Sequence, residues 1–161
     1  MKVAIFMGSK SDEATVRPCA DILKKLGIEY VFTISSAHRT PERTERLVSE
    51  FEAEGCQVYI CAAGMAAHLA GAVAARTLKP VIGIPVTSGN LGGMDALLST
   101  VMMPAGFPVA TVALDKSGAR NAAWLAAQIL ALHDAALAKR LRQERAAMAA
   151  DVEKSAAELE D

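Results

Sequence analysis

The sequence is poor in aromatic residues and in net charge, and it has no long continuous apolar stretch. Aromatic side chains make up 4% of its 161 residues against 52% hydrophobic residues overall, so any core must be mainly aliphatic. The formal net charge is −1, which supplies no basic field of the kind that attracts nucleic acid. No continuous apolar run approaches the roughly 20 residues that a helix needs to cross a bilayer. We therefore expect neither a nucleic-acid partner nor a membrane partner.

Cysteine is also scarce. The three cysteines, Cys19, Cys56 and Cys61, are odd in number and lack the spacing of metal ligands. Cys19 and Cys61 fall within predicted elements, which favours small buried hydrophobic side chains over a redox pair or a reactive thiol. The first residues, Met1–Met7, contain one basic residue and an apolar run too short for a signal-peptide core. These features predict a cytoplasmic protein with no bound metal.

Five short apolar runs alternate with helix-like segments. The runs are typical of strands buried in a parallel sheet, and they cover residues 3–7, 30–34, 57–62, 81–86 and 109–114. Helical spacing and end signals predict helices over about 11–26, about 41–53, a segment ending near 78, about 94–102 and about 119–133. Gly27 and Gly55 are expected to end the first two helices. This alternation predicts an α/β fold, with three αβα layers around five parallel strands.

The composition changes after His133, where Ala, Glu, Lys, Arg and Leu dominate. Residues 134–150 are predicted to form an added C-terminal helix whose far end frays. Its charges indicate a solvated face. Three apolar residues in it would also suit packing against a neighbouring subunit: Leu137, Leu141 and Met148. We expect residues 1–161 to form a single domain, with 134–161 as a helical extension.

The first candidate site follows the first strand, where a glycine turn carries two hydroxyls into a helix. The segment Gly8-Ser9-Lys10-Ser11-Asp12 can bind phosphate through backbone N–H groups and the helix dipole. Its spacing matches neither the Walker motif nor the dinucleotide glycine fingerprint. Asp12 would repel a phosphate but can accept hydrogen bonds from ribose hydroxyls. The alternative is that Ser11 or Asp12 only caps the helix.

A second candidate site lies between the strand ending at Ile34 and the helix that opens at Pro41. There His38, with an unperturbed histidine pKa of about 6.5, stands beside the guanidinium of Arg39. This pair joins a proton carrier to an anion clamp, at the kind of βα junction where parallel sheets bind ligands. The alternative is a helix N-terminus with two exposed polar residues.

A third candidate site is the loop Ala63–Leu69, whose small residues let a flat ligand approach the backbone closely. His68 in this loop would either hydrogen-bond a ligand or satisfy a buried carbonyl group, and we favour the second role. His133 ends a helix, where a cation suits the dipole, and is assigned no function. Three methionines are expected to fill core or interface space rather than to bind a metal: Met94, Met102 and Met103.

Several motifs in these loops occur together in one order. The early ones are Met7–Asp12, Ser36–Pro41 and Ala66–Leu69. The later ones are Leu91, Gly93 and Asp95, then Leu97-Leu98-Ser99, Met103-Pro104, Pro108–Ala113 and Asn121-Ala122-Ala123. Across about residues 3–133 the chain resembles the N5-carboxyaminoimidazole ribonucleotide mutases of purine biosynthesis, a family also called the catalytic subunits of phosphoribosylaminoimidazole carboxylase.

The resemblance implies a flavodoxin-like sheet, a homo-octamer, and neither a metal nor an organic cofactor. Carried over to this sequence, it implies that Ser9, Ser11 and Arg39 hold the 5′-phosphate of a nucleotide substrate. Asp12 would bind the ribose. Functional coupling to the ATP-dependent carboxyaminoimidazole ribonucleotide synthase would follow, because that enzyme makes the substrate.

The implied reaction moves a carboxyl group from the exocyclic nitrogen of the substrate to a ring carbon. His38 would protonate the departing nitrogen, and carbon dioxide would be released into a closed pocket. The ring carbon would then capture it, and His38 would recover the carbon-bound proton. Ser36 and the Gly64–His68 loop, with His68 itself, would line the pocket for the imidazole ring. One near-neutral acid/base can serve both half-steps, and excluding water retains the carbon dioxide.

Some residues depart from the family pattern. The family usually has a second glycine where Met65 stands and a proline where Ala70 stands. The Thr87–Asn90 segment and the Gly92-Gly93 pair are also unusual. These departures fall on the predicted rim of the pocket, so they bear on its carboxyl-binding geometry rather than on the class of reaction.

Three other functions compete with the mutase. A related branch of the family carboxylates aminoimidazole ribonucleotide with free carbon dioxide, but it tends to have lysine after the histidine, whereas Arg39, Pro41 and Ala66–Leu69 favour the mutase. An FMN-binding, flavodoxin-like electron carrier would suit the sheet and the serine-rich first loop. Such carriers stack aromatic rings on the flavin, and no strand-end loop here offers Trp or Tyr. An assembly scaffold built on the C-terminal helix would explain neither His38 nor Arg39.

Overall fold

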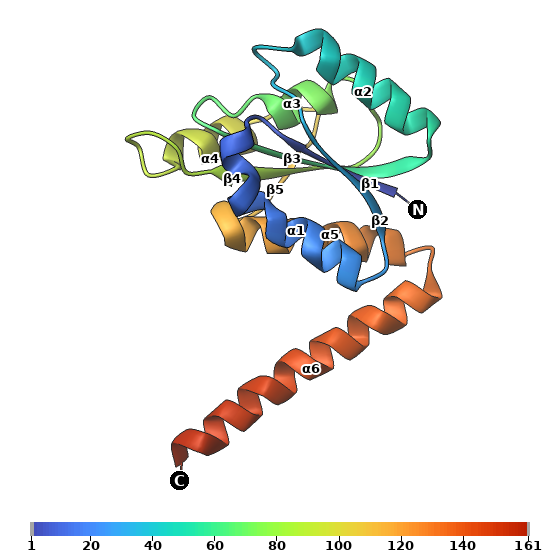
Figure 1. The fold of residues 1–161 in the computed structure, drawn as a ribbon, viewed down its shortest axis with the longest axis vertical. Coiled ribbons are helices and arrows are strands. Elements are labelled where there is room, and N and C mark those ends of the chain that lie inside the picture. Colours follow the sequence, from blue (N-terminus) through green and yellow to red (C-terminus); the bar gives the residue numbers. More distant parts are fainter. Residues whose placement is uncertain (1, 161) are drawn as a thin grey trace.

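The computed structural model describes residues 2–160, which form a five-stranded sheet between layers of helices (Figure 1). The strands are β1 (Lys2–Met7), β2 (Glu29–Ile34), β3 (Cys56–Gly64), β4 (Val81–Val86) and β5 (Ala110–Thr111). Their order across the sheet is β2-β1-β3-β4-β5, and every neighbouring pair is parallel. This is the doubly wound order of flavodoxin-like folds, so the predicted three-layer α/β architecture is confirmed.

Helices cover both faces of this sheet. They are α1 (Glu13–Lys25), α2 (Pro41–Ala53), α3 (Leu69–Ala74), α4 (Met94–Val101), α5 (Asp115–Ala131) and α6 (Ala135–Glu160), with a short 3-10 helix, η1 (Lys10–Asp12), before α1. In Figure 1, α1 and α5 lie below the sheet and α2 and α3 above it. Side chains along a strand alternate between faces, so Val3, Ile5 and Met7 pack with α1 and α5, whereas Ala4 and Phe6 pack with α2 and α3.

The few aromatic residues of the core gather on the α2 and α3 face. Phe6 lies with its ring centroid 5.8 Å from that of Phe51 and 6.0 Å from that of Tyr59. The fully buried Tyr59 donates a hydrogen bond of 2.9 Å from its hydroxyl to the backbone carbonyl of Val48 in α2. This bond ties a helix directly to the central strand of the sheet.

Several elements differ from their predicted extents. Helix α3 ends at Ala74 rather than near residue 78, and the turn that follows leaves Leu78 fully exposed with no apolar partner to extend the helix. Strand β5 has two residues rather than six, because only Ala110 and Thr111 pair with β4, at Ile82 and Gly83. Helix α5 begins at Asp115, a few residues earlier than its apolar spacing indicated.

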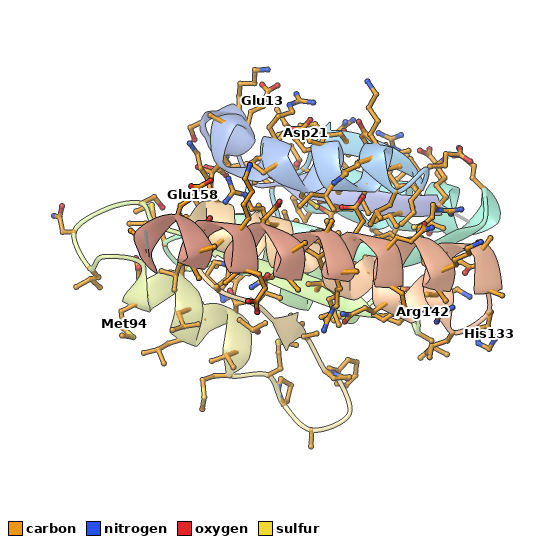
Figure 2. The ribbon with its side chains drawn as sticks, turned by 90° about the horizontal axis from the view of Figure 1, so that it is seen from below. Glu13, Asp21, Met94, His133, Arg142 and Glu158 are labelled. Atoms are coloured by element: carbon orange, nitrogen blue, oxygen red, sulfur yellow. The ribbon has the colours of Figure 1, made fainter. Side chains whose placement is uncertain are left out.

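The C-terminal helix is longer than predicted. Helix α6 continues through Glu160 instead of fraying, and Figure 1 shows it as a single rod leaving the sheet. Only its first part is anchored: Leu137 is buried in the core of the α1 and α5 face, and Lys25 of α1 forms an ion pair with Glu144. Figure 2 shows the helix from below, running between His133 and Glu158. Among the described residues, no helix combines the length and apolarity that crossing a membrane would require.

Replacing Tyr59 by phenylalanine should lower the free energy of unfolding by about 1 kcal/mol, because the hydrogen bond to Val48 is lost while the ring stays in place. Urea unfolding would measure the difference. Tyr30→Phe on β2, where the side chain is half-buried, is the matched control. A Tyr59→Phe variant as stable as the parent would show that this bond adds nothing to the docking of α2.

Candidate active site

A cavity of about 520 Å³ lies where the carboxyl ends of β1, β2, β3 and β4 meet. Residues after each of these strands line it: the loops 8–12, 36–39 and 63–69, and Ser88. The structure brings all seven predicted site residues into this one cavity: Ser9, Ser11, Asp12, Ser36, His38, Arg39 and His68. Parallel strands share one carboxyl edge, which is why loops distant in the sequence converge here.

Two other cavities lie elsewhere. One of about 780 Å³ surrounds residues 74–81 at the start of β4, and one of about 540 Å³ lies between α5 and α6 beside Trp124. Neither lining contains a histidine, so neither offers a side chain that ordinarily titrates near neutral pH. Of these three cavities, the one at the strand carboxyl ends is therefore the one equipped for acid/base chemistry.

Backbone hydrogen bonds fix the loops of the site to one another. The ladder of the sheet continues past β1, since the amide of Ser35 donates to Met7 O at 2.9 Å and the amide of Gly8 donates to Ala62 O at 3.0 Å. The Arg39 guanidinium then reaches from the β2 loop to the β1 loop, where it donates to Gly8 O at 3.0 Å. Three loops are thus held in register before any ligand binds.

The serine turn after β1 is closed by Ser9, not by the residues expected to cap the helix. The Ser9 hydroxyl accepts hydrogen bonds from the Ser11 amide at 3.3 Å and the Ser11 hydroxyl at 2.9 Å, and it caps η1. Asp12 occupies the cap position of α1 without a side-chain cap bond, so the capping role predicted for Ser11 or Asp12 is wrong. The two serine hydroxyls instead face each other at the cavity wall.

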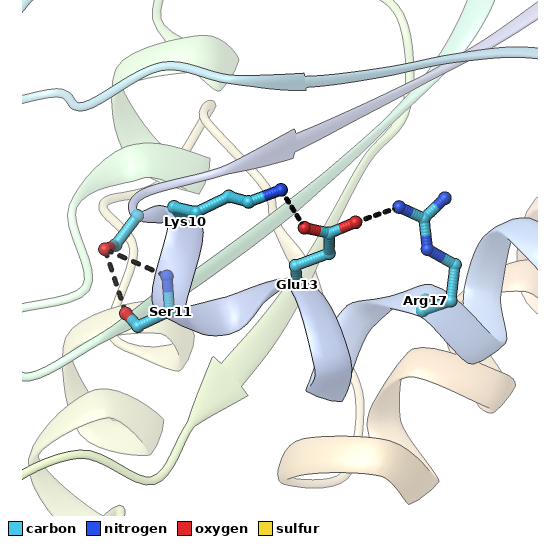
Figure 3. A network of polar contacts seen from close by, with 5 residues as sticks. Lys10, Ser11, Glu13 and Arg17 are labelled. Atoms are coloured by element: carbon cyan, nitrogen blue, oxygen red, sulfur yellow. Dashed lines mark hydrogen bonds and ion pairs between the residues drawn. The ribbon is translucent and has the colours of Figure 1, made fainter.

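Beside this turn, the negative charge of Glu13 in α1 is neutralised by two neighbouring cations. Figure 3 shows Glu13 between Lys10 and Arg17, and it forms ion pairs with both. These cations hold the pKa of Glu13 below its usual range through their hydrogen bonds to it. Lys10 is therefore engaged on the outer surface and does not line the cavity. Arg39 is the cation that the cavity presents.

Asp12 is a buried carboxyl group in the wall of the cavity. Burial raises its pKa, against the opposing effects of the Ser11 hydroxyl, the Ser9 backbone and the charge of Arg39. The Ser11 hydroxyl donates to Asp12 Oδ1 at 3.1 Å. A buried carboxylate with spare acceptor capacity suits hydroxyl groups as ligands.

Ser36 and Arg39 line the cavity from the loop after β2. The backbone amide of Arg39 donates to the Ser36 hydroxyl at 3.2 Å, and its Nε lies 3.5 Å from the same oxygen. One guanidinium nitrogen is engaged by Gly8 O. Because a guanidinium carries five N–H donors, the exposed Arg39 retains donors for an anion in the cavity.

His38 and His68 meet at the centre of the site. His38 Nε2 lies 2.5 Å from His68 Nδ1, and the two rings are nearly perpendicular, at 76°. His68 is exposed and its side chain is hydrogen-bonded to His38, so the favoured idea that it satisfies a buried carbonyl is wrong. A nitrogen–nitrogen hydrogen bond needs one donor and one acceptor, so the pair shares a single proton across this contact.

Comparison with known proteins places this chain in a family. A model of the family described as AIR carboxylase matches residues 2–151. The chain belongs to the AIR carboxylase family. It is 50% identical to a protein of Escherichia coli strain K12 named N5-carboxyaminoimidazole ribonucleotide mutase, over 94% of this chain and 89% of that one. A protein of the same name from Brucella melitensis is 53% identical, over 93% of each chain.

Solved structures agree with the family assignment. The crystal structure of Treponema denticola PurE superposes with a TM-score of 0.90 at 33% identity and covers 99% of both chains. A 3-dehydroquinate dehydratase-like protein from Bifidobacterium longum reaches a TM-score of 0.54 at 14% identity, over 81% of this chain and 98% of that one. That second likeness concerns the fold alone. The flavodoxin-like sheet is therefore common to proteins with different names.

One residue that lines this cavity, Ser88, was not predicted as a site residue from the sequence. Ser88 lines the cavity from the loop after β4, and a Cβ built on Gly64 would lie 1.9 Å from the Ser88 hydroxyl oxygen. Because Gly64 has no side chain, the Ser88 hydroxyl has room to lie against the wall of the cavity. Met65 has a φ of 55°, in the left-handed region that favours glycine, which gives a physical reason for the glycine usual at that position. The unusual Thr87–Asn90 segment was the signal that pointed toward Ser88.

The lining also limits what the cavity can bind. It contains no Phe, Tyr or Trp, so it offers no aromatic ring of the kind that stacks on a flavin. Within residues 2–160, no three His, Cys, Asp or Glu side chains are grouped so that they could hold a metal ion. What the cavity does present is hydroxyls, one guanidinium, one buried carboxyl and two imidazoles. This set fits a small anionic, hydroxyl-bearing ligand on which a proton is moved.

Asp12→Asn should make the protein more stable at neutral pH. Because burial raises the pKa of Asp12, the folded state binds its proton more tightly than the unfolded state does, and stability falls as pH rises above the ordinary value of 3.8. The advantage of the variant should therefore grow between about pH 3 and about pH 7 in thermal unfolding. Asp21→Asn, on the exposed side of α1, is the control. An Asp12→Asn protein that is less stable than its parent at pH 7 would contradict a raised pKa at this carboxyl group.

Met65→Gly should raise the free energy of unfolding by about 0.5–1 kcal/mol, because the left-handed backbone conformation costs a residue with a Cβ more than it costs glycine. The side chain is 62% exposed, so little packing is lost. Denaturant unfolding would measure the change. Ala66→Gly, at an exposed neighbour without positive φ, should instead destabilise the protein. If both variants lose stability equally, the conformation of Met65 carries no strain.

Proposed function

We propose that this protein is an N5-carboxyaminoimidazole ribonucleotide mutase. It would convert N5-carboxyaminoimidazole ribonucleotide to 4-carboxy-5-aminoimidazole ribonucleotide in de novo purine biosynthesis. The observation that carries the proposal is the His38–His68 contact of 2.5 Å in the same cavity as the serine turn and Arg39. Relatives at 50% and 53% identity bear the name of this enzyme.

The phosphate end of the nucleotide would bind between the β1 and β2 loops. The hydroxyls of Ser9 and Ser11, which otherwise bond to each other, can turn their protons toward phosphate oxygens. Arg39 supplies a charge-assisted contact with the donors that Gly8 O leaves free. Asp12 would then accept hydrogen bonds from the ribose hydroxyls. Anchoring the phosphate in this way fixes how far along the cavity the imidazole ring of the substrate extends.

His38 would act first as an acid and then as a base. It gives a proton to the exocyclic nitrogen as the carbon–nitrogen bond breaks and carbon dioxide leaves. The electron pair of the ring carbon attacks the carbon dioxide, and His38 removes the proton from that carbon to restore aromaticity. His38 gives up one proton and regains one within each cycle, so no cofactor is needed.

His68 and the loops would organise this chemistry. A shared proton between the rings defines which His38 nitrogen is free and holds the imidazole in one orientation. Ser36 and the Gly64–His68 loop would line the substrate ring, where small residues permit close approach. Carbon dioxide stays available only if the occupied cavity excludes water.

We also propose that the protein assembles as a homo-octamer in the cytoplasm and receives its substrate from the ATP-dependent carboxyaminoimidazole ribonucleotide synthase. Exposed apolar side chains on and after α4 support self-association, since such patches are usually covered. They include Met94, Leu98, Val101, Met102 and Phe107. Figure 2 shows Met94 at an outer edge of the molecule, away from α6. Light scattering of the purified protein would give its mass in solution.

Direct carboxylation is the competing reaction. A product assay should compare the carbamate nucleotide, without ATP, against aminoimidazole ribonucleotide with bicarbonate. The mutase predicts fast conversion of the carbamate. Faster turnover of the second mixture would favour the carboxylase.

His38→Asn should abolish turnover of the carbamate nucleotide, because asparagine keeps a similar size but cannot exchange a proton. Losses of about 100-fold or more are expected for a group that transfers a proton in both half-steps. Steady-state kinetics and circular dichroism would separate lost chemistry from lost folding. His133→Asn, on an exposed turn outside the cavity, is the matched control. A fully active His38→Asn enzyme would end the proposal.

A further inference from the structure

The loop after β4 is held at both ends by the start of α5. Asp115, the first residue of α5, accepts two hydrogen bonds from Thr87: one from its amide at 2.8 Å and one from its hydroxyl at 2.7 Å. At the other end of the loop, a Cβ on Gly93 would lie 2.2 Å from Leu114 Cδ2 and 2.7 Å from the Thr87 hydroxyl. We call the paired hydrogen bonds between Thr87 and Asp115 the Thr87–Asp115 clamp.

This clamp is not part of helix capping. The cap residue of α5, Leu114, has no side-chain cap bond, and the carboxylate oxygens of Asp115 point to Thr87 rather than to the helix amides. Asp115 also has a φ of 56°, a left-handed conformation that residues with a Cβ rarely adopt. Such conformations persist where surrounding contacts enforce them, and here two hydrogen bonds do so. The two hydrogen bonds therefore fix the loop after β4 and do not cap α5.

What the clamp positions is Ser88, the next residue in the chain. Ser88 lines the cavity, and its hydroxyl occupies the space over Gly64. Across the sheet, β3 and β1 separate β4 from β2, so Ser88 and Arg39 belong to opposite ends of the site. A nucleotide whose phosphate lies at Ser9 and Arg39 would therefore extend its other end, the ring with its carboxyl group, toward Ser88.

We propose that Ser88 is a substrate-binding residue whose hydroxyl donates a hydrogen bond to the carboxyl group of the nucleotide, and that Thr87 and Asp115 are positioning residues that act through it. The inference rests on the proposed function and adds the group that recognises the carboxylate. It also gives a role to Thr87, one of the departures noted above, because this threonine and Asp115 form the two halves of the clamp.

Steady-state kinetics on the full-length protein test the proposal. Ser88→Ala should raise KM for the carbamate nucleotide about tenfold with little change in kcat, since a hydrogen bond to a charged group is lost from the bound state. Asp115→Ala should raise KM in the same direction but by less, about threefold, because it removes no contact to the substrate and acts only through the position of Ser88. Asp115→Asn should restore near-parental KM, because its amide can accept from the Thr87 amide and tolerates the left-handed conformation. Ser117→Ala, exposed on α5, is the control.

A double variant separates positioning from general stability. If Asp115 acts through Ser88, then Ser88→Ala combined with Asp115→Ala should have the KM of Ser88→Ala alone. A merely structural role would add the two effects. Should Asp115→Ala fold poorly by circular dichroism, Thr87→Val gives the same reading, because it removes the hydroxyl and keeps the amide.

The outcomes for the proposed function and for Ser88 can be told apart. A parental protein without mutase activity would overturn the proposed function and this inference with it. An active parent whose KM is unchanged in Ser88→Ala would overturn the inference alone. Additive effects of Ser88→Ala and Asp115→Ala would overturn the positioning role.

Discussion

The site depends on backbone hydrogen bonds that continue the ladder of the sheet beyond the ends of the strands. Ser35 continues the pairing of β2 with β1, and Gly8 continues the pairing of β1 with β3. Because these bonds belong to the sheet, the loops that follow the three strands inherit its register. Arg39 then joins the β2 loop to the β1 loop through Gly8 O. The positions of the β1, β2 and β3 loops follow from this continuation of the sheet, whereas the β4 loop with Ser88 is tied to α5 through Thr87 and Asp115.

The loop positions place different chemical groups at different points along the cavity. Hydroxyls and a guanidinium gather at the β1 and β2 end, the two imidazoles meet in the middle, and Ser88 stands at the β4 end. An elongated ligand with an anionic tail can satisfy all three only in one orientation. The buried Asp12 fits the proposed role in ribose binding, since burial raises its pKa and its charged form therefore lowers stability at neutral pH.

The fold could be predicted from the sequence because it rests on local signals. Apolar runs marked the strands, and Gly27 and Gly55 ended the helices with φ of 69° and 85° as their positions indicated. The contact between His38 and His68 could not be predicted, because the two residues are brought together by strand order and not by spacing. The same holds for Ser88, whose entry depends on the missing side chain of Gly64. The sequence motifs indicated which loops would line the site, whereas only the tertiary structure determined which of their atoms face one another.

A crystal structure of the protein with 4-carboxy-5-aminoimidazole ribonucleotide tests the central claim most directly. We predict the phosphate within hydrogen-bond distance of Ser9, Ser11 and Arg39, and the carboxylated ring carbon beside the imidazole of His38. A nucleotide bound with its phosphate outside this serine turn, or with its ring turned away from both histidines, would contradict that claim.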